Sequence, residues 1–179
     1  MGRRYPMRVQ RYSRPAILLH WAQAILIAWL LWLGWTMVEL PKGAERSAAY
    51  NLHKSLGLCA FLLVLCRLAW RFYCPPPPSQ LLKRQALLAE LAHRVIYIML
   101  LAVPLAGYLL SSFTAYSIKF FGIELPKTGW PDEALNGTFK LLHEAGGWAL
   151  TALIVLHVAA ALHHAIRRDG TMQRMLPGR

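Results

Sequence analysis

Four apolar stretches, each long enough to cross a lipid bilayer, constrain the fold of this chain more than any other feature. Because an α-helix rises about 1.5 Å per residue and the hydrocarbon core is about 30 Å thick, roughly 20 apolar residues span it. With 56% hydrophobic residues and a mean hydropathy of +0.35, the 179-residue chain is too apolar for a soluble domain. We therefore predict an all-α fold, an integral membrane four-helix bundle that residues 1–179 form as a single domain. The expected spans lie near Ile17–Val38, Leu52–Tyr73, Leu91–Phe113 and Phe139–Ile166.

The net charge of +12 follows the expected membrane topology. It raises the question of nucleic acid, but the apolar residues form unbroken runs instead of alternating with basic ones, so no nucleic-acid partner is expected. Fourteen of the 20 basic residues and two of the eight acidic ones fall in the leader 1–14, the region 67–94 or the tail 167–179. By the positive-inside rule, we expect both termini to be cytoplasmic. The first span lacks a small-x-small cleavage site, so we expect it to be retained.

The connections between the spans are expected to differ in kind. The proline run 75–78 should end the second span, and residues 79–90 resemble a short amphipathic helix at the inner membrane surface. Residues 116–138 form the longest connection, on the outer side, where a loop can cap a site or dock a partner. Pro104 and Gly107 predict a kink in the third span. With His93 at its cytoplasmic start, this span should pack and not supply ligands.

Four histidines pair by depth across the predicted bundle. When the chain is followed up and down through the membrane, His20 and His157 lie near the cytoplasmic side, and His53 and His143 lie near the outer side. His143 and His157 are 14 residues apart on the fourth span. This spacing is close to four turns, so both rings share one face and lie about 21 Å apart. One helix can therefore supply an axial ligand to each of two stacked sites.

Small residues follow each of these four histidines at the third or fourth position. A porphyrin pressed against a ligand-bearing helix requires small neighbours there, although small residues also help membrane helices to pack. Four such instances in register with four histidines favour the porphyrin. The small residues are Ala24, Gly57, Gly146, Gly147, Ala160 and Ala161.

Non-covalent haem is the ligand that these histidines favour. Imidazoles are costly in hydrocarbon unless they serve a ligand, and two imidazoles at each of two depths suit bis-histidine haem. No CxxCH motif for covalent attachment occurs. Zinc lacks its third and fourth donors at either depth, and a metal transporter would need acidic residues within the spans.

Other polar residues near the span ends have two possible roles each. Haem propionates need counter-charges, and basic residues at both depths are suitably placed, although interfacial snorkelling explains them equally well. These residues are Arg14, Arg67, Arg71, Lys54 and Lys140. For His93, His163 and His164, an interfacial or hydrogen-bonded role is the simpler interpretation. His164 has a propionate or a quinone as an alternative partner.

Several motifs together resemble the bacterial cytochrome b561 family. They are LLHW at 18–21, HKSLG at 53–57, LAHRVIY at 91–97, AVPLAGY at 102–108, LLHEAGG at 141–147 and LHVAAALHH at 156–164. The resemblance covers nearly the whole chain and implies a multi-pass protein of the bacterial inner membrane with two b haems. It also implies that His20 and His157 ligate the inner haem iron, and His53 and His143 the outer one.

The function that the resemblance implies is transfer of single electrons to ubiquinone. A small free-standing bacterial member of the family is known as a superoxide oxidase, which takes the electron from periplasmic superoxide, and this chain is similar to it in length and motif set. Larger relatives are electron-relay subunits of membrane dehydrogenases or hydrogenases, with a redox partner protein, and this is the alternative. A haem-free transporter or structural membrane protein is a third hypothesis. The sequence does not locate the quinone site beyond a haem edge near a bilayer interface.

Overall fold

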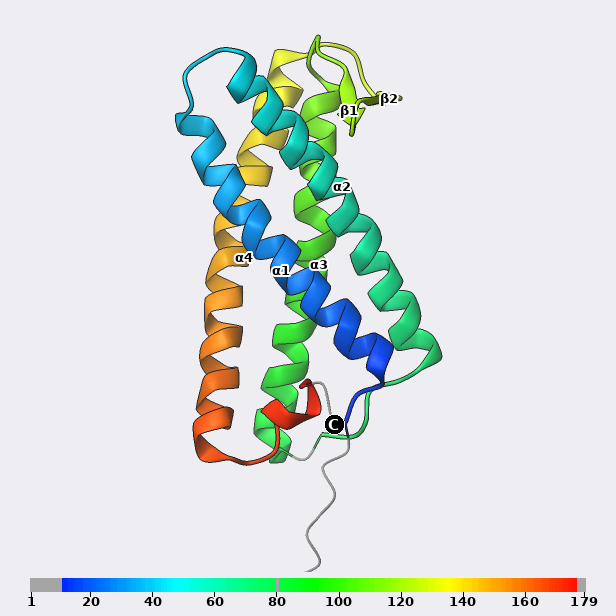
Figure 1. The fold of residues 1–179 in the computed structure, drawn as a ribbon, viewed down its shortest axis with the longest axis vertical. Coiled ribbons are helices and arrows are strands. Elements are labelled where there is room, and N and C mark those ends of the chain that lie inside the picture. The colour runs from blue at the N-terminus through cyan, green and yellow to red at the C-terminus, as the bar shows by residue number, and fades with distance from the viewer. Residues whose placement is uncertain (1–10, 80, 177–179) are drawn as a thin grey trace, which may run out of the picture.

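The computed structural model describes residues 11–79 and 81–176, and four long helices dominate this part of the chain (Figure 1). The helices are α1 (Arg14–Glu39), α2 (Ala44–Tyr73), α3 (Lys83–Ser112) and α4 (Glu133–Arg167). All four are long and apolar enough to cross a membrane. The prediction of a four-helix membrane bundle is thereby confirmed. The remaining elements are short: β1 (Ile118–Phe120), β2 (Ile123–Leu125) and the 3-10 helix η1 (Met172–Arg174).

Successive helices run up and down along the long axis of the molecule (Figure 1). The close contacts are between α1 and α2, between α3 and α4, and between α2 and α3, whereas α1 and α4 pack much less closely within the described ranges. The start of α1 and η1 lie at one end, which we call the terminal end. The strands β1 and β2 lie at the other, the hairpin end. The cytoplasmic location of the termini stays a prediction.

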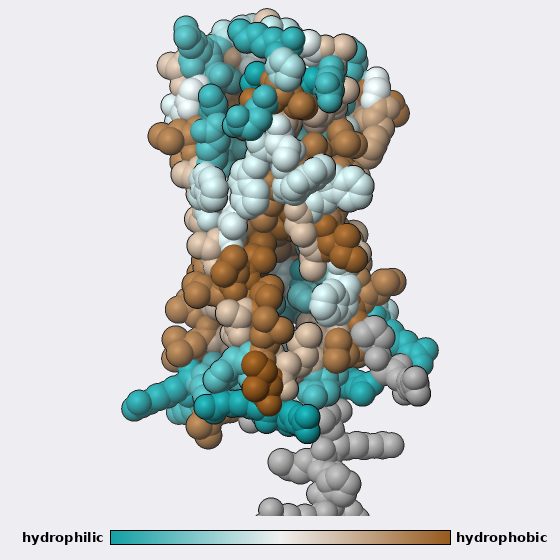
Figure 2. All heavy atoms as spheres, turned by 60° about the vertical axis from the view of Figure 1, so that its left-hand side comes forward, coloured by the Kyte–Doolittle hydropathy of each residue, from teal (hydrophilic) through white to brown (hydrophobic). Residues whose placement is uncertain are grey.

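Apolar side chains occupy both the centre of the bundle and its outer surface. The buried cluster takes members from all four helices: Ile27, Leu30, Ala60, Val64, Leu100 and Leu150. Large apolar side chains such as Leu18, Trp29 and Trp32 are exposed. Figure 2 shows an apolar belt between two hydrophilic ends, with hydrophilic atoms visible in a hollow of its lower half. Such a belt is suited to lipid.

The helices are longer than the apolar stretches from which they were predicted. α2 begins at Ala44 instead of Leu52, and α4 begins at Glu133 instead of Phe139. The prediction of a separate interfacial helix over 79–90 is wrong, because α3 runs without a break from Lys83. Residues 83–90 are mostly good helix formers, so the helix extends beyond the apolar span. The length of an apolar stretch indicates how much of the helix lies in the hydrocarbon core, while helix propensity and capping determine where the helix begins and ends.

The connection over 116–138 contains a small hairpin that the sequence did not predict. β1 and β2 pair antiparallel around Phe121 and Gly122, which adopt φ angles of 47° and 94°. This left-handed two-residue turn matches the twist of the strands. The backbone N–H of Phe121 donates to Ser55 Oγ at 2.9 Å, and that hydroxyl lies 3.3 Å from the Lys119 carbonyl oxygen. The hairpin is therefore fixed to α2 two residues after His53.

At the terminal end, η1 joins three segments that are distant in the chain. The Arg174 side chain is buried and donates to the carbonyl oxygens of Pro77 and Pro78 at 2.6 and 3.0 Å. Its own carbonyl oxygen accepts from the Tyr12 N–H at 3.1 Å. The proline run ends α2 as predicted, and these contacts use the carbonyl oxygens that the prolines leave free of helical bonds.

Candidate functional site

The terminal half of the bundle brings the rings of His20 of α1 and His157 of α4 close together, edge to face. Their ring centroids are 6.3 Å apart and the ring planes are inclined at 66°. Both residues are half-buried. These are the two histidines that the predicted topology placed at one depth, and the structure brings them together.

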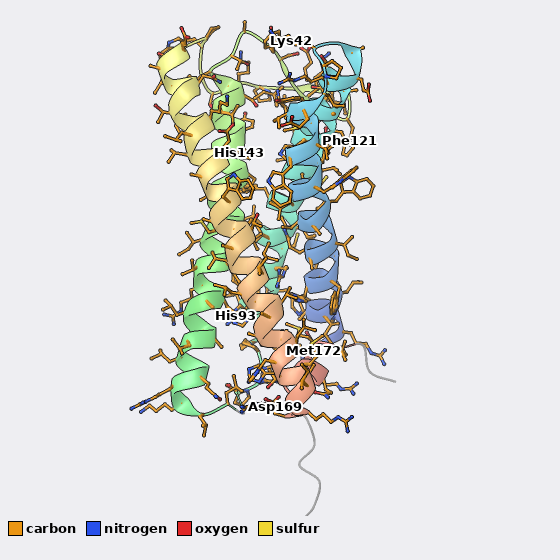
Figure 3. The ribbon with its side chains drawn as sticks, turned by 90° about the vertical axis from the view of Figure 1, so that its left-hand side faces the viewer. Lys42, His93, Phe121, His143, Asp169 and Met172 are labelled. Carbon is orange, nitrogen blue, oxygen red and sulfur yellow. The ribbon has the colours of Figure 1, made fainter. Side chains whose placement is uncertain are left out.

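The hairpin half holds the second pair, His53 of α2 and His143 of α4. The centroids of these rings are 6.0 Å apart and the planes are nearly perpendicular, at 88°. Figure 3 shows His143 in the hairpin half of the bundle and His93 in the terminal half. α4 therefore supplies one ring to each pair, as its 14-residue spacing predicts.

The separation of the rings fits one iron between the members of each pair. A metal–imidazole bond is about 2 Å long. The ring centroid lies about 1 Å behind the ligating nitrogen, so two imidazoles on opposite sides of one iron have centroids about 6 Å apart. Both observed separations agree with this value. Among the described residues, no group of three or more His, Cys, Asp or Glu side chains converges as a structural zinc site would require.

The small residues after the histidines do not all serve the same purpose. A Cβ added at Gly57 or at Gly147 would meet no atom within 4 Å, so no neighbouring side chain blocks the approach of a flat ligand to α2 or α4 at these positions. A Cβ at Gly146 would lie 2.9 Å from Val103 Cγ2, so Gly146 serves the packing of α4 on α3. Of this adjacent pair of glycines, Gly147 is the one that leaves space.

α3 orients the ring of His143. The Nδ1–H of His143 donates to the Val103 carbonyl oxygen at 2.8 Å, so in the neutral ring Nε2 is the nitrogen without a proton, the one able to bind a metal. The ring also lies directly against Gly107, where a Cβ would be 2.9 Å from both Cε1 and Nδ1. Pro104 and Gly107, which predicted only a kink, thus lie where α3 meets this ring. α3 supplies no member of either pair but positions one.

The ring of His53 is positioned by packing against α1. Its Nδ1 is buried and has no hydrogen-bond partner among the residues that the structure describes. A Cβ at Gly34 of α1 would lie 3.2 Å from His53 Cε1, so the ring rests against the α1 backbone. The two rings of the hairpin-end pair are therefore positioned in different ways.

The side chain of Arg67, a candidate counter-charge for a haem propionate, contacts the ring of His20. Its Nη2 lies 3.2 Å from His20 Nδ1, and its guanidinium carbon lies 5.2 Å from the centroid of the Tyr97 ring. A guanidinium can only donate, so this contact needs an unprotonated Nδ1. An imidazole that binds iron through Nε2 carries its proton on Nδ1. If His20 were to bind iron through Nε2, Arg67 would have to turn away from Nδ1, and the Tyr97 ring offers it a second partner.

His93 is the residue whose position the sequence interpretation misjudged. Because α3 begins at Lys83, His93 lies well inside this helix and not at its start. Its ring centroid is 5.4 Å from that of His157, so three histidines gather at the terminal end. The signal that could have placed it is the run of helix-forming residues that precedes the apolar span.

The last two histidines lie outside both pairs. His164 Nδ1 is 2.5 Å from Asp169 Oδ2, so a carboxylate occupies the ring nitrogen for which a propionate or quinone was an alternative. This contact and the Thr171 N–H hold the pKa of Asp169 at about 2, below its ordinary value. The ring of His163 packs edge-on against that of His164, with centroids 5.8 Å apart. At the hairpin end, Lys140 lies 3.9 Å from Glu144, a partner that offsets its charge.

The fold and the paired histidines define a class of four-helix membrane protein with one histidine pair at each of two depths. Residues 11–178 match the family model described as prokaryotic cytochrome b561. The chain is 33% identical over 174 residues to cytochrome b561 homolog 2 of Escherichia coli K12, covering 93% of this chain and 92% of that protein. It is 32% identical over 188 residues to cytochrome b561 homolog 1 of the same organism, covering 96% and 99%. It is also 29% identical over 174 residues to the probable superoxide oxidase CybB of Yersinia pestis, covering 94% and 97%.

The chain belongs to the prokaryotic cytochrome b561 family. It is accordingly a haem b membrane electron carrier, and the predicted family resemblance and multi-pass membrane location are confirmed.

Proposed function

We propose that this protein is a di-haem b oxidoreductase that carries single electrons to ubiquinone in the bacterial inner membrane, with periplasmic superoxide as donor. The observation that carries the proposal is the pairing of His20 with His157 and of His53 with His143. His20 and His157 would be the axial ligands of one haem b, and His53 and His143 those of the second. The two ligands on α4 lie about 21 Å apart along the helix, which spans most of the hydrocarbon core.

Each pair of imidazoles would fill both axial positions of an iron porphyrin, which when bound supplies one-electron transfer without binding of oxygen at the iron. The chain's own groups set the geometry. The Val103 carbonyl oxygen accepts the proton of Nδ1 of His143, so that Nε2 would be the nitrogen that binds the metal. Gly34 and Gly107 allow the rings of His53 and His143 to lie close to α1 and α3.

The hairpin end suits an anionic donor such as superoxide. Lys54 directly follows His53, and Lys127 is near enough to Lys54 for the two ammonium groups to repel each other. Lys119 and Lys140 contribute less, because Glu124 and Glu144 lie 4.0 and 3.9 Å from them. With the termini in the cytoplasm, as the charge distribution predicts, this positive site faces the periplasm and attracts anions. The name of the Yersinia relative, probable superoxide oxidase, supports the same donor.

The test is reduction of the purified protein by superoxide in the presence of a soluble ubiquinone. We expect a ratio of two haems per chain. Superoxide should reduce the haem faster than superoxide is lost by spontaneous dismutation, and ubiquinol should form only when superoxide is present. Reduction no faster than a catalase- and dismutase-treated control would refute superoxide as donor. Copurification of an iron–sulfur subunit from native membranes, together with that result, would support the relay function instead.

A further inference from the structure

We propose that a cavity between α2 and α3 at the terminal end binds the phosphate headgroup of an anionic phospholipid. The cavity has a volume of about 490 Å³, within the range of about 300–1,000 Å³ typical of ligand pockets. Two positions of α2 and five of α3 form its walls: Leu68, Arg71, Glu90, His93, Arg94, Tyr97 and Ile98. None of these seven residues is a member of a histidine pair, although His93 lies beside His157, and the proposal does not depend on the function proposed above.

The charge of the cavity favours an anion. Arg94 is balanced by Glu90, with Nη2 and Oε1 2.5 Å apart. Arg71 forms no ion pair with any other described residue, and its guanidinium carbon lies 6.0 Å from the centroid of the Tyr97 ring. The walls therefore carry one net positive charge, and Arg67, stacked on the same Tyr97 ring, adds a second nearby. Guanidinium groups bind phosphate through paired N–H donors, so Arg71 is the primary candidate for a phosphate contact.

The position of the cavity selects a lipid over a soluble anion. Arg71 lies in the last turn of α2, at the end of a candidate membrane span, where headgroups would meet the protein. The side chains of Arg94 and Glu90 are 70% and 51% exposed, so the polar part of the cavity is open to the interface. Ile98 is 58% exposed one turn further toward the bilayer centre, where an acyl chain would continue. Basic pockets between membrane helices on the cytoplasmic side are suited to anionic headgroups.

A neutral ligand or a haem substituent accounts for the cavity less well. A neutral ring gains little from guanidinium groups, which remain costly to desolvate without an anion. The His93 ring, 5.4 Å from the His157 ring, belongs both to the cavity wall and to the histidine cluster, so a propionate is the competing anion. The two anions make different predictions: a propionate contact contributes to haem retention, whereas a lipid contact does not.

The experiment compares the thermal unfolding of the full-length protein with its haem in neutral detergent after addition of phosphatidylglycerol, phosphatidylcholine or inorganic phosphate. We expect phosphatidylglycerol to raise Tm in a saturable manner and the other two to have much smaller effects. Arg71→Gln should weaken the apparent affinity for phosphatidylglycerol about tenfold. Arg84→Gln removes the same charge at the start of α3, away from the cavity, and should bind like the unchanged protein. The haem-to-protein ratio should be equal in all three proteins.

Each other result overturns the proposal. Equal stabilisation by both lipids in the unchanged protein would remove the anionic specificity, and this comparison needs no variant to fold. Full stabilisation by inorganic phosphate alone would assign the cavity to a free anion. Equal weakening in Arg84→Gln would indicate attraction by the overall charge of this end. Loss of haem in Arg71→Gln would assign the cavity to a propionate.

Discussion

The carbonyl oxygen of Val103 accepts a hydrogen bond from Nδ1 of His143 at 2.8 Å, across the contact between α3 and α4. Val103 directly precedes Pro104, and Gly107 lies one turn later against the same ring. A helix without a member in either histidine pair thus determines which nitrogen of His143 is free. Because Cε1 and Nδ1 of His143 lie against the α3 backbone at Gly107, the position of this ring depends on a residue without a side chain.

Gly107→Ala should displace the His143 ring and lower the haem content. The added Cβ would lie 2.9 Å from Cε1 and Nδ1, closer than real Cβ contacts, so the ring must move away from the Val103 carbonyl. Overpacking of this kind costs about 1–3 kcal/mol. We expect about one haem per chain, measured as the haem-to-protein ratio by pyridine haemochrome absorbance. Gly137→Ala on α4 is the matched control, because its Cβ would meet nothing within 4 Å. Full haem content in Gly107→Ala would show that this contact does not position the ligand.

Single replacements of the paired histidines should remove one haem each. His53→Ala or His143→Ala should remove the hairpin-end haem and leave the other, and His20→Ala or His157→Ala should do the converse, because the pairs are separate in space. The two haems can be distinguished by redox titration of the reduced absorption bands. His163→Ala, outside both pairs, is the control and should retain two haems. Loss of both haems from every single variant would contradict two independent sites.

The depth of each histidine could be predicted because the two quantities that determine it, the length of the apolar stretches and the rise of the helix, do not depend on detailed packing. Apolar length fixes how many times the chain crosses, and a rise of about 1.5 Å per residue fixes the height of each ring. His20 and His157 therefore share a level whatever side chains surround them. The contacts of Gly34 and Gly107 with the rings could not be predicted, because they depend on how the helices are rotated about their axes. Packing against neighbouring helices sets that rotation.

The misplacement of His93 has a different physical cause. Hydropathy marks the end of the hydrocarbon, and α3 continues past that limit to Lys83 because its residues favour helix in either environment. Interaction partners within connections were equally hard to predict. Asp169 lies only five residues after His164, but the chain brings it back to the ring through Arg168, whose φ of 53° is left-handed. No spacing rule predicts that conformation for arginine.

Arg67→Gln should lower the midpoint potential of the terminal-end haem. When Arg67 turns away from Nδ1 of His20, the Tyr97 ring still holds its guanidinium near that histidine. A nearby positive charge stabilises the reduced iron, which carries one positive charge less. We expect a shift on the order of tens of millivolts at the terminal end and no shift at the hairpin end. Spectroelectrochemical titration of the purified protein measures both potentials. Arg84→Gln should change neither, and equal shifts of both haems in Arg67→Gln would mean that the effect is not local.

Asp169→Asn should lower Tm at neutral pH and much less in strong acid. The His164 ring and the Thr171 N–H hydrogen-bond the ionised carboxylate, which lowers the pKa of Asp169 from its ordinary 3.8 to about 2 in the folded protein. A depressed folded-state pKa gives stability that is fully present above pH 3.8 and is lost as the pH falls through about 2. Because Asp169 is partly exposed, the effect should not exceed about 1 kcal/mol. Thermal unfolding of both proteins between pH 7 and pH 2 measures it, and we expect the difference in Tm to be much smaller at pH 2 than at pH 7. A difference that stays constant over this range would indicate that the side chain stabilises the end of α4 by its shape and not by its charge.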